Sequence, residues 1–176
     1  MNIKTLVAAS TLALTVISLS GCGDKASAPV TEGVTDAMLK SGVPGEWLTY
    51  GLDTGEHRFS PLNAVNDKTV GQLGLAWSAD LDTARGQEAT PLMHDGVLYV
   101  STAWSMVKAY DAKTGAPKWA YDPKVPKETL VRACCDAVNR GVALYGDKVY
   151  VATLDGRLVA LDQETGKVAW EKTVVP

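Results

Sequence analysis

The sequence has little of what nucleic-acid-binding proteins and nicotinamide-dependent enzymes use to bind their ligands. Acidic residues outnumber basic ones, 20 to 17, and the formal net charge is −3, so no basic footprint for nucleic acid is present. No glycine-rich phosphate-binding turn lies between a strand and a helix, which argues against NAD. The sequence also lacks a Cys-x-x-Cys-His motif, the usual attachment site of a c-type haem.

Histidine is also scarce, and the sequence has only two. His57 lies in the polar stretch Asp53–Arg58, and His94 lies at a hairpin turn just before Gly96. Both positions predict exposed loop side chains. No segment has the pattern of a long amphipathic helix.

The first residues have the order of a bacterial export signal. Lys4 supplies a positive charge, residues 6–19 are apolar or small, and Leu19-Ser20-Gly21-Cys22 follows. The apolar stretch is shorter than the roughly 20 residues that a transmembrane helix needs. We therefore expect residues 1–21 to be removed and the protein to be periplasmic.

The Leu-Ser-Gly-Cys sequence resembles a lipobox, which predicts that Cys22 is acylated and anchors the protein to a membrane. Simple cleavage after Ala26-Ser27-Ala28 is the alternative, although Pro29 weakens that site. Residues 22–44 are mostly small and polar and predict a flexible tether. Residues 45–176 then form the folded domain.

An internal repeat organises this domain. A constant offset of 51 positions, without a gap, pairs identical residues: Tyr99 with Tyr150, Val100 with Val151, Thr102 with Thr153, Ala109 with Ala160, Asp111 with Asp162, Thr114 with Thr165, Gly115 with Gly166, and Trp119 with Trp170. A repeat of about 50 residues with β-type patterning is typical of stacked propeller sheets. The repeat units span about 89–122 and 140–174, and the fold class is all-β.

Each unit predicts two alternating strands, a turn and a short strand that contains tryptophan. The strands are expected at 97–102 and 106–110 in the first unit and at 149–153 and 157–161 in the second. The turn has the sequence Asp-x-x-Thr-Gly, in which Asp and Thr side chains can bind turn amides and Gly accepts a positive φ. The tryptophans are expected to pack between neighbouring sheets.

Cys134 and Cys135 are adjacent. Consecutive Cα atoms are about 3.8 Å apart, whereas a relaxed disulfide prefers roughly 4.4–6.8 Å. Two small buried thiols are therefore one interpretation. A strained disulfide with a flat sulfur surface is the other, and an exported protein would meet the oxidising conditions that it needs.

The chain resembles the eight-bladed quinoprotein alcohol dehydrogenases, which use pyrroloquinoline quinone (PQQ), and is most similar to their quinohaemoprotein branch. The matching motifs are Arg58-Phe-Ser-Pro-Leu62, Gly74-Leu-Ala-Trp77, Gly86-Gln-Glu-Ala-Thr-Pro91, Asp111-Ala-Lys-Thr-Gly-Ala-Pro-Lys-Trp119, Cys134-Cys-Asp-Ala-Val-Asn-Arg-Gly141 and Asp162-Gln-Glu-Thr-Gly-Lys-Val-Ala-Trp170. The resemblance implies an eight-bladed β-propeller of which this chain contains about the first two blades.

The resemblance also implies a cofactor site. Cys134 and Cys135 match the vicinal disulfide that lies against one face of PQQ. Arg140 matches an arginine at the cofactor's edge, where its fixed fork of donors suits a carboxylate or quinone oxygen; an ion pair at the surface or between blades is the alternative. Glu88 matches a glutamate at another edge of PQQ, and a solvated loop carboxylate is the alternative.

The family's metal ligands and catalytic aspartate lie on later blades, so the resemblance implies no catalytic or metal-binding residue in this chain. It implies that the full-length enzyme oxidises a primary alcohol to an aldehyde with PQQ and Ca²⁺ or a lanthanide, passes electrons to a cytochrome c, and in this branch has a haem c domain. These 176 residues alone are expected to be inactive. The alternative is a non-catalytic, lipid-anchored propeller that acts as an outer-membrane assembly scaffold.

Overall fold

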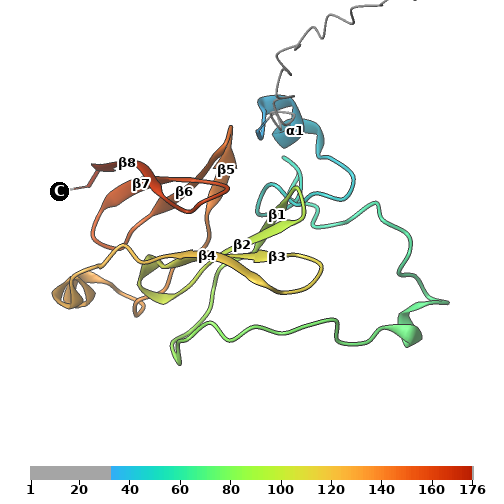
Figure 1. Cartoon of the computed structure of the whole chain (residues 1–176), viewed down its shortest axis with the longest axis horizontal. Coiled ribbons are helices and arrows are strands. Elements are labelled where there is room, and N and C mark those ends of the chain that lie inside the picture. Colours follow the sequence, from blue (N-terminus) through green and yellow to red (C-terminus); the bar gives the residue numbers. More distant parts are fainter. Residues whose placement is uncertain (1–32, 176) are drawn as a thin grey trace, which may run out of the picture. The chain divides into compact units, whose positions relative to one another are not determined.

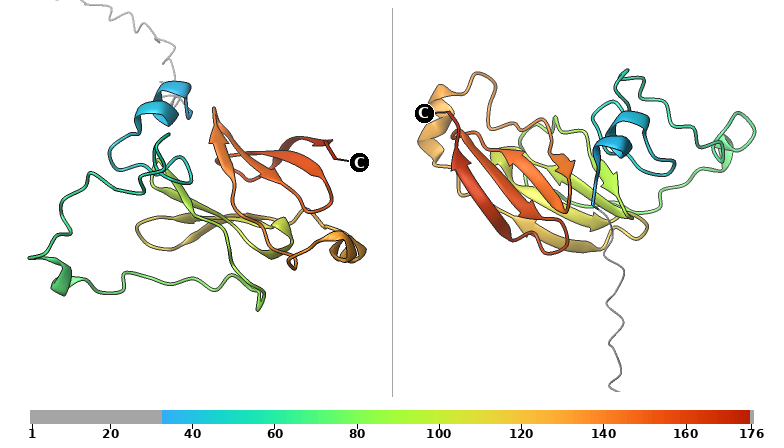
Figure 2. Two further views of the ribbon diagram at one scale, coloured as in Figure 1. Left: turned by 180° about the vertical axis from the view of Figure 1, so that it is seen from behind. Right: turned by 90° about the horizontal axis from the view of Figure 1, so that it is seen from above.

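The computed structural model describes residues 33–175, which form two four-stranded antiparallel sheets (Figure 1). The strands of the first sheet, in spatial order, are β1 (Leu92–His94), β2 (Val97–Ser101), β3 (Val107–Asp111) and β4 (Pro117–Tyr121). Those of the second are β5 (Ala143–Tyr145), β6 (Lys148–Ala152), β7 (Arg157–Asp162) and β8 (Val168–Thr173). The all-β prediction is confirmed, and the two sheets lie side by side in both views of Figure 2.

The two sheets repeat one another in register. Tyr99 faces Ala109 across β2 and β3, and Tyr150 faces Ala160 across β6 and β7. The pairing of the third and fourth strands shifts directly after Ala109 in one sheet and directly after Ala160 in the other. The offset of 51 positions in the sequence therefore corresponds to a structural repeat. The short first strands, β1 and β5, were not expected, because three residues are too few to show an alternating pattern.

The turn after the third strand has the predicted chemistry in both sheets. The Asp111 carboxylate accepts hydrogen bonds from the backbone amide and hydroxyl of Thr114, at 2.7 and 2.8 Å. Asp162 accepts the same pair from Thr165, at 2.9 and 2.7 Å. These bonds favour the ionised carboxylates, so the pKa of each aspartate is lowered, first of all by the threonine hydroxyl.

The Trp119 side chain joins the two sheets. The Trp119 indole donates to the carbonyl oxygen of Gln163 at 2.9 Å, and a Cβ added at Gly166 would lie 2.6 Å from the Trp119 ring. Trp77 repeats this contact on the first sheet, donating to Ala112 O at 3.1 Å. The expected packing between neighbouring sheets is thus confirmed for Trp119. The Trp170 side chain, which is equivalent to Trp119, is exposed.

The core is formed by aliphatic side chains of both sheets together with two residues from the chain before β1. Its buried members are Val34, Leu48, Leu92, Tyr99, Val107, Ala109, Leu144, Val149, Val151, Val159 and Leu161. Burying a Val or Leu side chain stabilises a fold by about 1.5–3 kcal/mol. One continuous core therefore links the two repeat units.

The predicted tether at residues 22–44 is too long, because its described part is folded. Helix α1 (Asp36–Ser41) begins after the N-cap Thr35. Val34 is buried, and its backbone N and O atoms exchange hydrogen bonds with Gly146 at 2.8 and 2.7 Å. The predicted export signal and Cys22 lie outside the described residues. Between residues 33 and 175, no helix has the length and hydrophobicity to cross a membrane.

The two histidines differ. His57 is exposed as predicted, and its Nδ1 atom lies 2.8 Å from Asp53. The prediction for His94 was wrong, since its side chain is buried at the end of β1, with Nδ1 3.4 Å from a Glu46 carboxylate oxygen. His94 is the last residue of β1, and its side chain faces Glu46 in the segment before that strand. The hairpin sequence alone could not show this contact.

Three short 3₁₀ helices complete the described elements: η1 (Val70–Gln72), η2 (Ala103–Ser105) and η3 (Lys127–Arg132). Of these, η1 lies in a long extended segment before β1 that runs away from the sheets in Figure 1. The other two lie next to the predicted cofactor-binding residues, η2 between β2 and β3 and η3 between β4 and β5.

Candidate cofactor-binding site

The connection between the two sheets, residues 122–142, carries η3 and then the adjacent cysteines. Cys134 and Cys135 are joined by a disulfide, with their Cα atoms 3.8 Å apart. Both residues are exposed. The sulfur pair is thus a surface feature rather than part of the core, and the alternative of two buried thiols does not describe this structure.

The segment before β1 runs beside the end of this connection and brings two predicted site residues together. The Nε atom of Arg140 lies 3.3 Å from a carboxylate oxygen of Glu88. Their side chains are 75% and 42% exposed, so the guanidinium is accessible to a ligand. The sequence analysis placed these residues at different edges of a cofactor and gave an ion pair as the alternative for Arg140, but it did not identify Glu88 as the partner.

A partly buried polar network adjoins Arg140 in the sequence, and Asn139 is at its centre. The Asn139 Oδ1 atom accepts hydrogen bonds from the Ser101 hydroxyl at 2.6 Å and the Gly141 amide at 3.0 Å. Its Nδ2 atom donates to the carbonyl oxygen of Ala152 at 2.9 Å and to Ser105 Oγ at 3.2 Å. Ser101 and Ser105 are fully buried in the first sheet and η2. Asn139 therefore connects the cysteine-containing loop to both sheets.

The turn at η2 supports the same loop through its backbone. Trp104 and Ser105 have φ values of 63° and 58°, a left-handed conformation that is costly for residues with a Cβ atom. The Trp104 amide donates to Ala137 O at 2.8 Å, and the Leu154 amide donates to Ser105 Oγ at 3.1 Å. Backbone strain of this kind is frequent where a structure holds a functional site.

Two arginines hold the rest of the loop. Arg85 pairs with Asp136, next to the disulfide, and lies 5.2 Å from the centre of the Trp104 ring. Arg157 bonds Asp155 through two of its nitrogens and donates to the carbonyl oxygen of Pro123 at 2.6 Å. The connection is therefore fixed near its beginning and around the cysteine pair.

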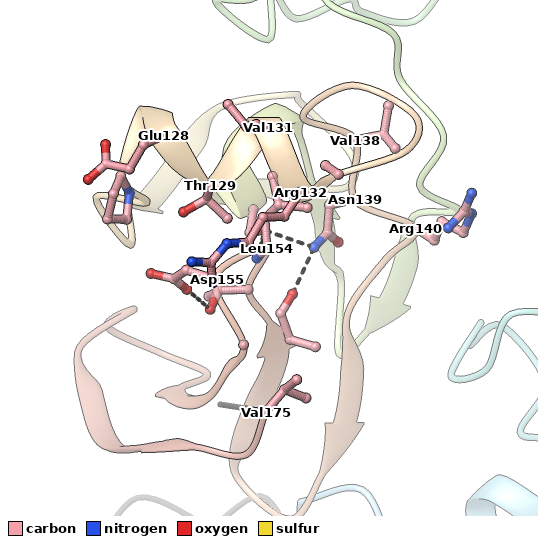
Figure 3. Close-up of a pocket in the computed structure, with 16 residues that line it drawn as sticks. Glu128, Thr129, Val131, Arg132, Val138, Asn139, Arg140, Leu154, Asp155 and Val175 are labelled. Carbon is pink, nitrogen blue, oxygen red and sulfur yellow. Dashed lines mark hydrogen bonds between the residues drawn. The ribbon is translucent and has the colours of Figure 1, made fainter.

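A cavity of about 960 Å³ lies between η3, the loop and the turn after β6 (Figure 3). Asn139 and Arg140 line it, and both also line a second hollow of about 420 Å³ near Tyr50. In Figure 3, Asn139 points towards its hydrogen-bond partners, whereas the Arg140 side chain extends to the opposite side. The Asn139–Arg140 pair thus separates the two hollows.

These groups suit a planar, acidic ligand. The exposed guanidinium can bind carboxylate or quinone oxygens through parallel hydrogen bonds, the Glu88 carboxylate can accept a proton or a hydrogen bond, and the disulfide offers a flat, polarizable surface. Among residues 33–175, no group of three or more His, Cys, Asp and Glu side chains is arranged to bind a metal ion.

Sequence reasoning missed the supporting residues Ser101, Ser105 and Asn139. Asn139 lies inside the Cys-Cys-Asp-Ala-Val-Asn-Arg-Gly motif, and its place beside Arg140 was a usable signal. The sequence carried no such signal for Ser101 and Ser105, which are small residues at the end of a strand and in a turn. Only the fold brings them to Asn139.

Comparison with known proteins identifies the fold. The family model for the β-propeller domain of PQQ-containing glucose, ethanol and alcohol dehydrogenases matches residues 47–171. The dehydrogenase subunit of the quinone alcohol dehydrogenase of Komagataeibacter europaeus is 51% identical over 160 residues, which cover 90% of this chain and 22% of that protein. The cytochrome c-linked 1-butanol dehydrogenase of Thauera butanivorans is 45% identical over 159 residues, 85% of this chain and 23% of that protein.

A solved structure of a related enzyme is also similar to this chain. The quinohemoprotein alcohol dehydrogenase ADHIIG of Pseudomonas putida HK5 superposes with a TM-score of 0.76 and 47% sequence identity, over 81% of this chain and 21% of that one. The chain thus spans about a fifth of the length of the relatives that it matches.

Proposed function

Because the chain belongs to the β-propeller family of PQQ-dependent glucose, ethanol and alcohol dehydrogenases, we propose that it supplies the first two blades of an enzyme that oxidises primary alcohols to aldehydes and passes the electrons to a cytochrome c. The observation that carries this proposal is the exposed Cys134–Cys135 disulfide on the same loop as Arg140, whose guanidinium pairs with Glu88 of the segment before β1. Alcohols and cytochrome c are also what the names of the related enzymes indicate.

Four residues of this chain would hold PQQ. The disulfide of Cys134 and Cys135 would lie against one face of its rings, and Arg140 would bind an acidic edge or a quinone oxygen through its planar fork of donors. Glu88 would accept or share a proton at the cofactor's rim. Bound PQQ supplies the two-electron redox chemistry at its quinone, and these side chains supply orientation and charge.

The Glu88–Arg140 ion pair favours one direction of the guanidinium before a cofactor binds. Exposed ion pairs contribute only about 0–1 kcal/mol to stability, so this pair is not needed to hold the fold together. The carboxylate of Glu88 lies 3.3 Å from the Arg140 Nε atom, close enough to restrict the directions that the guanidinium can take. A guanidinium whose direction is already restricted loses less conformational freedom when it binds a carboxylate.

The remaining components would come from other parts of the full-length enzyme. We propose that a Ca²⁺ or lanthanide ion and the catalytic aspartate that receives the alcohol proton are bound or supplied by later blades. A haem c domain would take up the electrons, in keeping with the quinohemoprotein name of one structural relative.

The proposal predicts that the full-length protein, purified without cofactor, shows alcohol-dependent reduction of an electron-accepting dye only after PQQ and Ca²⁺ or a lanthanide are added. Ethanol and 1-butanol would be the first substrates, with NAD as the negative control. If dye reduction stays absent with every metal while PQQ is bound, the proposed alcohol oxidation is wrong.

We propose that the protein is periplasmic and that a lipid on Cys22 holds it to a membrane. Replacing Cys22 with Ala is expected to move the protein from the membrane to the soluble fraction and to abolish incorporation of a labelled fatty acid. Cys134→Ala, which keeps the Cys22 site, is the matched control and should stay in the membrane fraction. Lipid labelling that persists in Cys22→Ala would contradict the lipobox.

A further inference from the structure

We propose that Asn139 is a positioning residue for the cofactor, which acts by fixing the backbone that carries Arg140. This inference rests on the proposed function, because it concerns how the chain presents Arg140 to PQQ. Asn139 does not need to touch the cofactor for this role, since its amide group is directed towards the two sheets (Figure 3).

The orientation of the Asn139 amide is determined by its partners. Gly141 N–H can only donate and Ala152 C=O can only accept, and they bind opposite ends of the amide at 3.0 and 2.9 Å. A flipped amide would lose both of these bonds. The bonds to Gly141 and Ala152 thus fix the orientation of the Asn139 amide, whereas the serine hydroxyls can donate or accept. Aspartate could keep the bond from the Gly141 amide but would place an acceptor against the Ala152 carbonyl oxygen.

Hydrogen bonds hold the backbone on both sides of Arg140. Gly141, whose amide binds Asn139, directly follows Arg140, and its φ of 137° is unfavourable for residues other than glycine. On the other side, the Trp104 amide holds Ala137. The backbone from 137 to 141 is therefore fixed at both ends. Figure 3 shows the Arg140 side chain extending from this segment to the side opposite the Asn139 hydrogen bonds.

Without these bonds, the guanidinium would remain in the protein but would no longer be held in one place. The Glu88 ion pair cannot replace the network, because both of its side chains are accessible to water and an exposed pair is weak. Loss of the Asn139 amide would also leave the buried hydroxyl groups of Ser101 and Ser105 without this partner.

The first test measures the loop in the full-length protein without PQQ. Asn139→Ala is expected to increase hydrogen exchange of the Gly141 amide about tenfold, the effect of losing a hydrogen bond of about 1.4 kcal/mol. Asn63→Ala, a change of an exposed asparagine outside the network, is the control. Unchanged exchange at Gly141 in Asn139→Ala would overturn the proposal.

The second test is a double-mutant cycle on PQQ affinity, measured by titration of the cofactor-free protein. Asn139→Ala alone is expected to weaken binding about tenfold, because binding would then have to fix the loop that Asn139 otherwise holds in place. In the Arg140→Ala background the same change should have less than about a twofold effect, because residues that act through one another are not additive. Ser101→Ala, which removes one bond to Asn139 Oδ1, provides a milder variant and should weaken binding less than Asn139→Ala.

The outcomes separate the inference from the proposed function. If Arg140→Ala weakens PQQ binding but Asn139→Ala weakens it equally with and without Arg140, Asn139 has only a general structural role and the inference is wrong. If Arg140→Ala leaves PQQ affinity unchanged, the proposed cofactor site itself is wrong, and the inference falls with it.

Discussion

Replacing Arg140 with Ala in the full-length protein is expected to weaken PQQ binding by about 2–5 kcal/mol, which corresponds to a loss of at least roughly thirtyfold in affinity. The expected loss is large because a bound PQQ carboxylate or quinone oxygen would lose its charged partner in a site that, as we propose, the later blades of the full-length enzyme cover. Glu88 would also lose the cation that lies 3.3 Å from it. Fluorescence titration of the cofactor-free protein measures the effect.

Arg58→Ala is the matched control for this prediction. Arg58 also forms an exposed ion pair with a glutamate, Glu56, at 3.3 Å, but it lies outside the proposed site. Its removal should leave PQQ affinity within about twofold, in line with the small contribution of exposed pairs. Arg140→Lys keeps the charge but loses the planar guanidinium, so its PQQ affinity should lie between those of the unchanged protein and Arg140→Ala. Equal PQQ affinities for Arg140→Ala and Arg58→Ala would contradict the role of Arg140.

The largest stability effect is expected for Gly166→Ala. A Cβ atom at this position would lie 2.6 Å from the Trp119 ring, and the backbone φ of 68° is left-handed. The left-handed backbone costs about 1–2 kcal/mol and overpacking against the indole about 1–3 kcal/mol. Together they predict a loss of about 2–5 kcal/mol, measured by urea unfolding with tryptophan fluorescence.

Gly96→Ala separates the two causes. Gly96 has nearly the same φ, 70°, but an added Cβ would have no atom within 4 Å, so only the backbone cost of about 1–2 kcal/mol applies. The difference between the two variants is the contribution of the contact between Gly166 and Trp119. If Gly96→Ala proves as destabilising as Gly166→Ala, the close packing of the tryptophan between the sheets does not matter for stability.

The repeat made most of the fold predictable from the sequence. Tyr99 and Tyr150, the Asp-x-x-Thr-Gly turns and the tryptophans recur with a constant offset because each serves the same local geometry. Local patterns could not show that Val34 pairs with Gly146, or that His94 is buried beside Glu46. Both contacts join segments that lie far apart in the sequence, and composition alone had suggested a tether and an exposed turn.

The residues of the candidate site were singled out on other grounds than the repeat. The sequence analysis singled out Glu88, Arg140 and the cysteine pair because they occur in two motifs that resemble those of a known family. The ion pair between Glu88 and Arg140 joins residues about 50 positions apart, and the Asn139 network joins the loop to both sheets. Neither leaves a periodic pattern, since side-chain hydrogen bonds of this kind depend on tertiary structure alone.

The central claim is that this chain forms one side of a PQQ site, and a structure of the full-length protein with bound PQQ tests it most directly. The account predicts that the Cys134–Cys135 disulfide lies against one face of the cofactor, that the Arg140 guanidinium donates to an oxygen at its edge, and that Asn139 keeps its bonds to Ser101 and Ala152 without touching the cofactor. A structure in which PQQ is bound away from Arg140 and the disulfide would contradict the account.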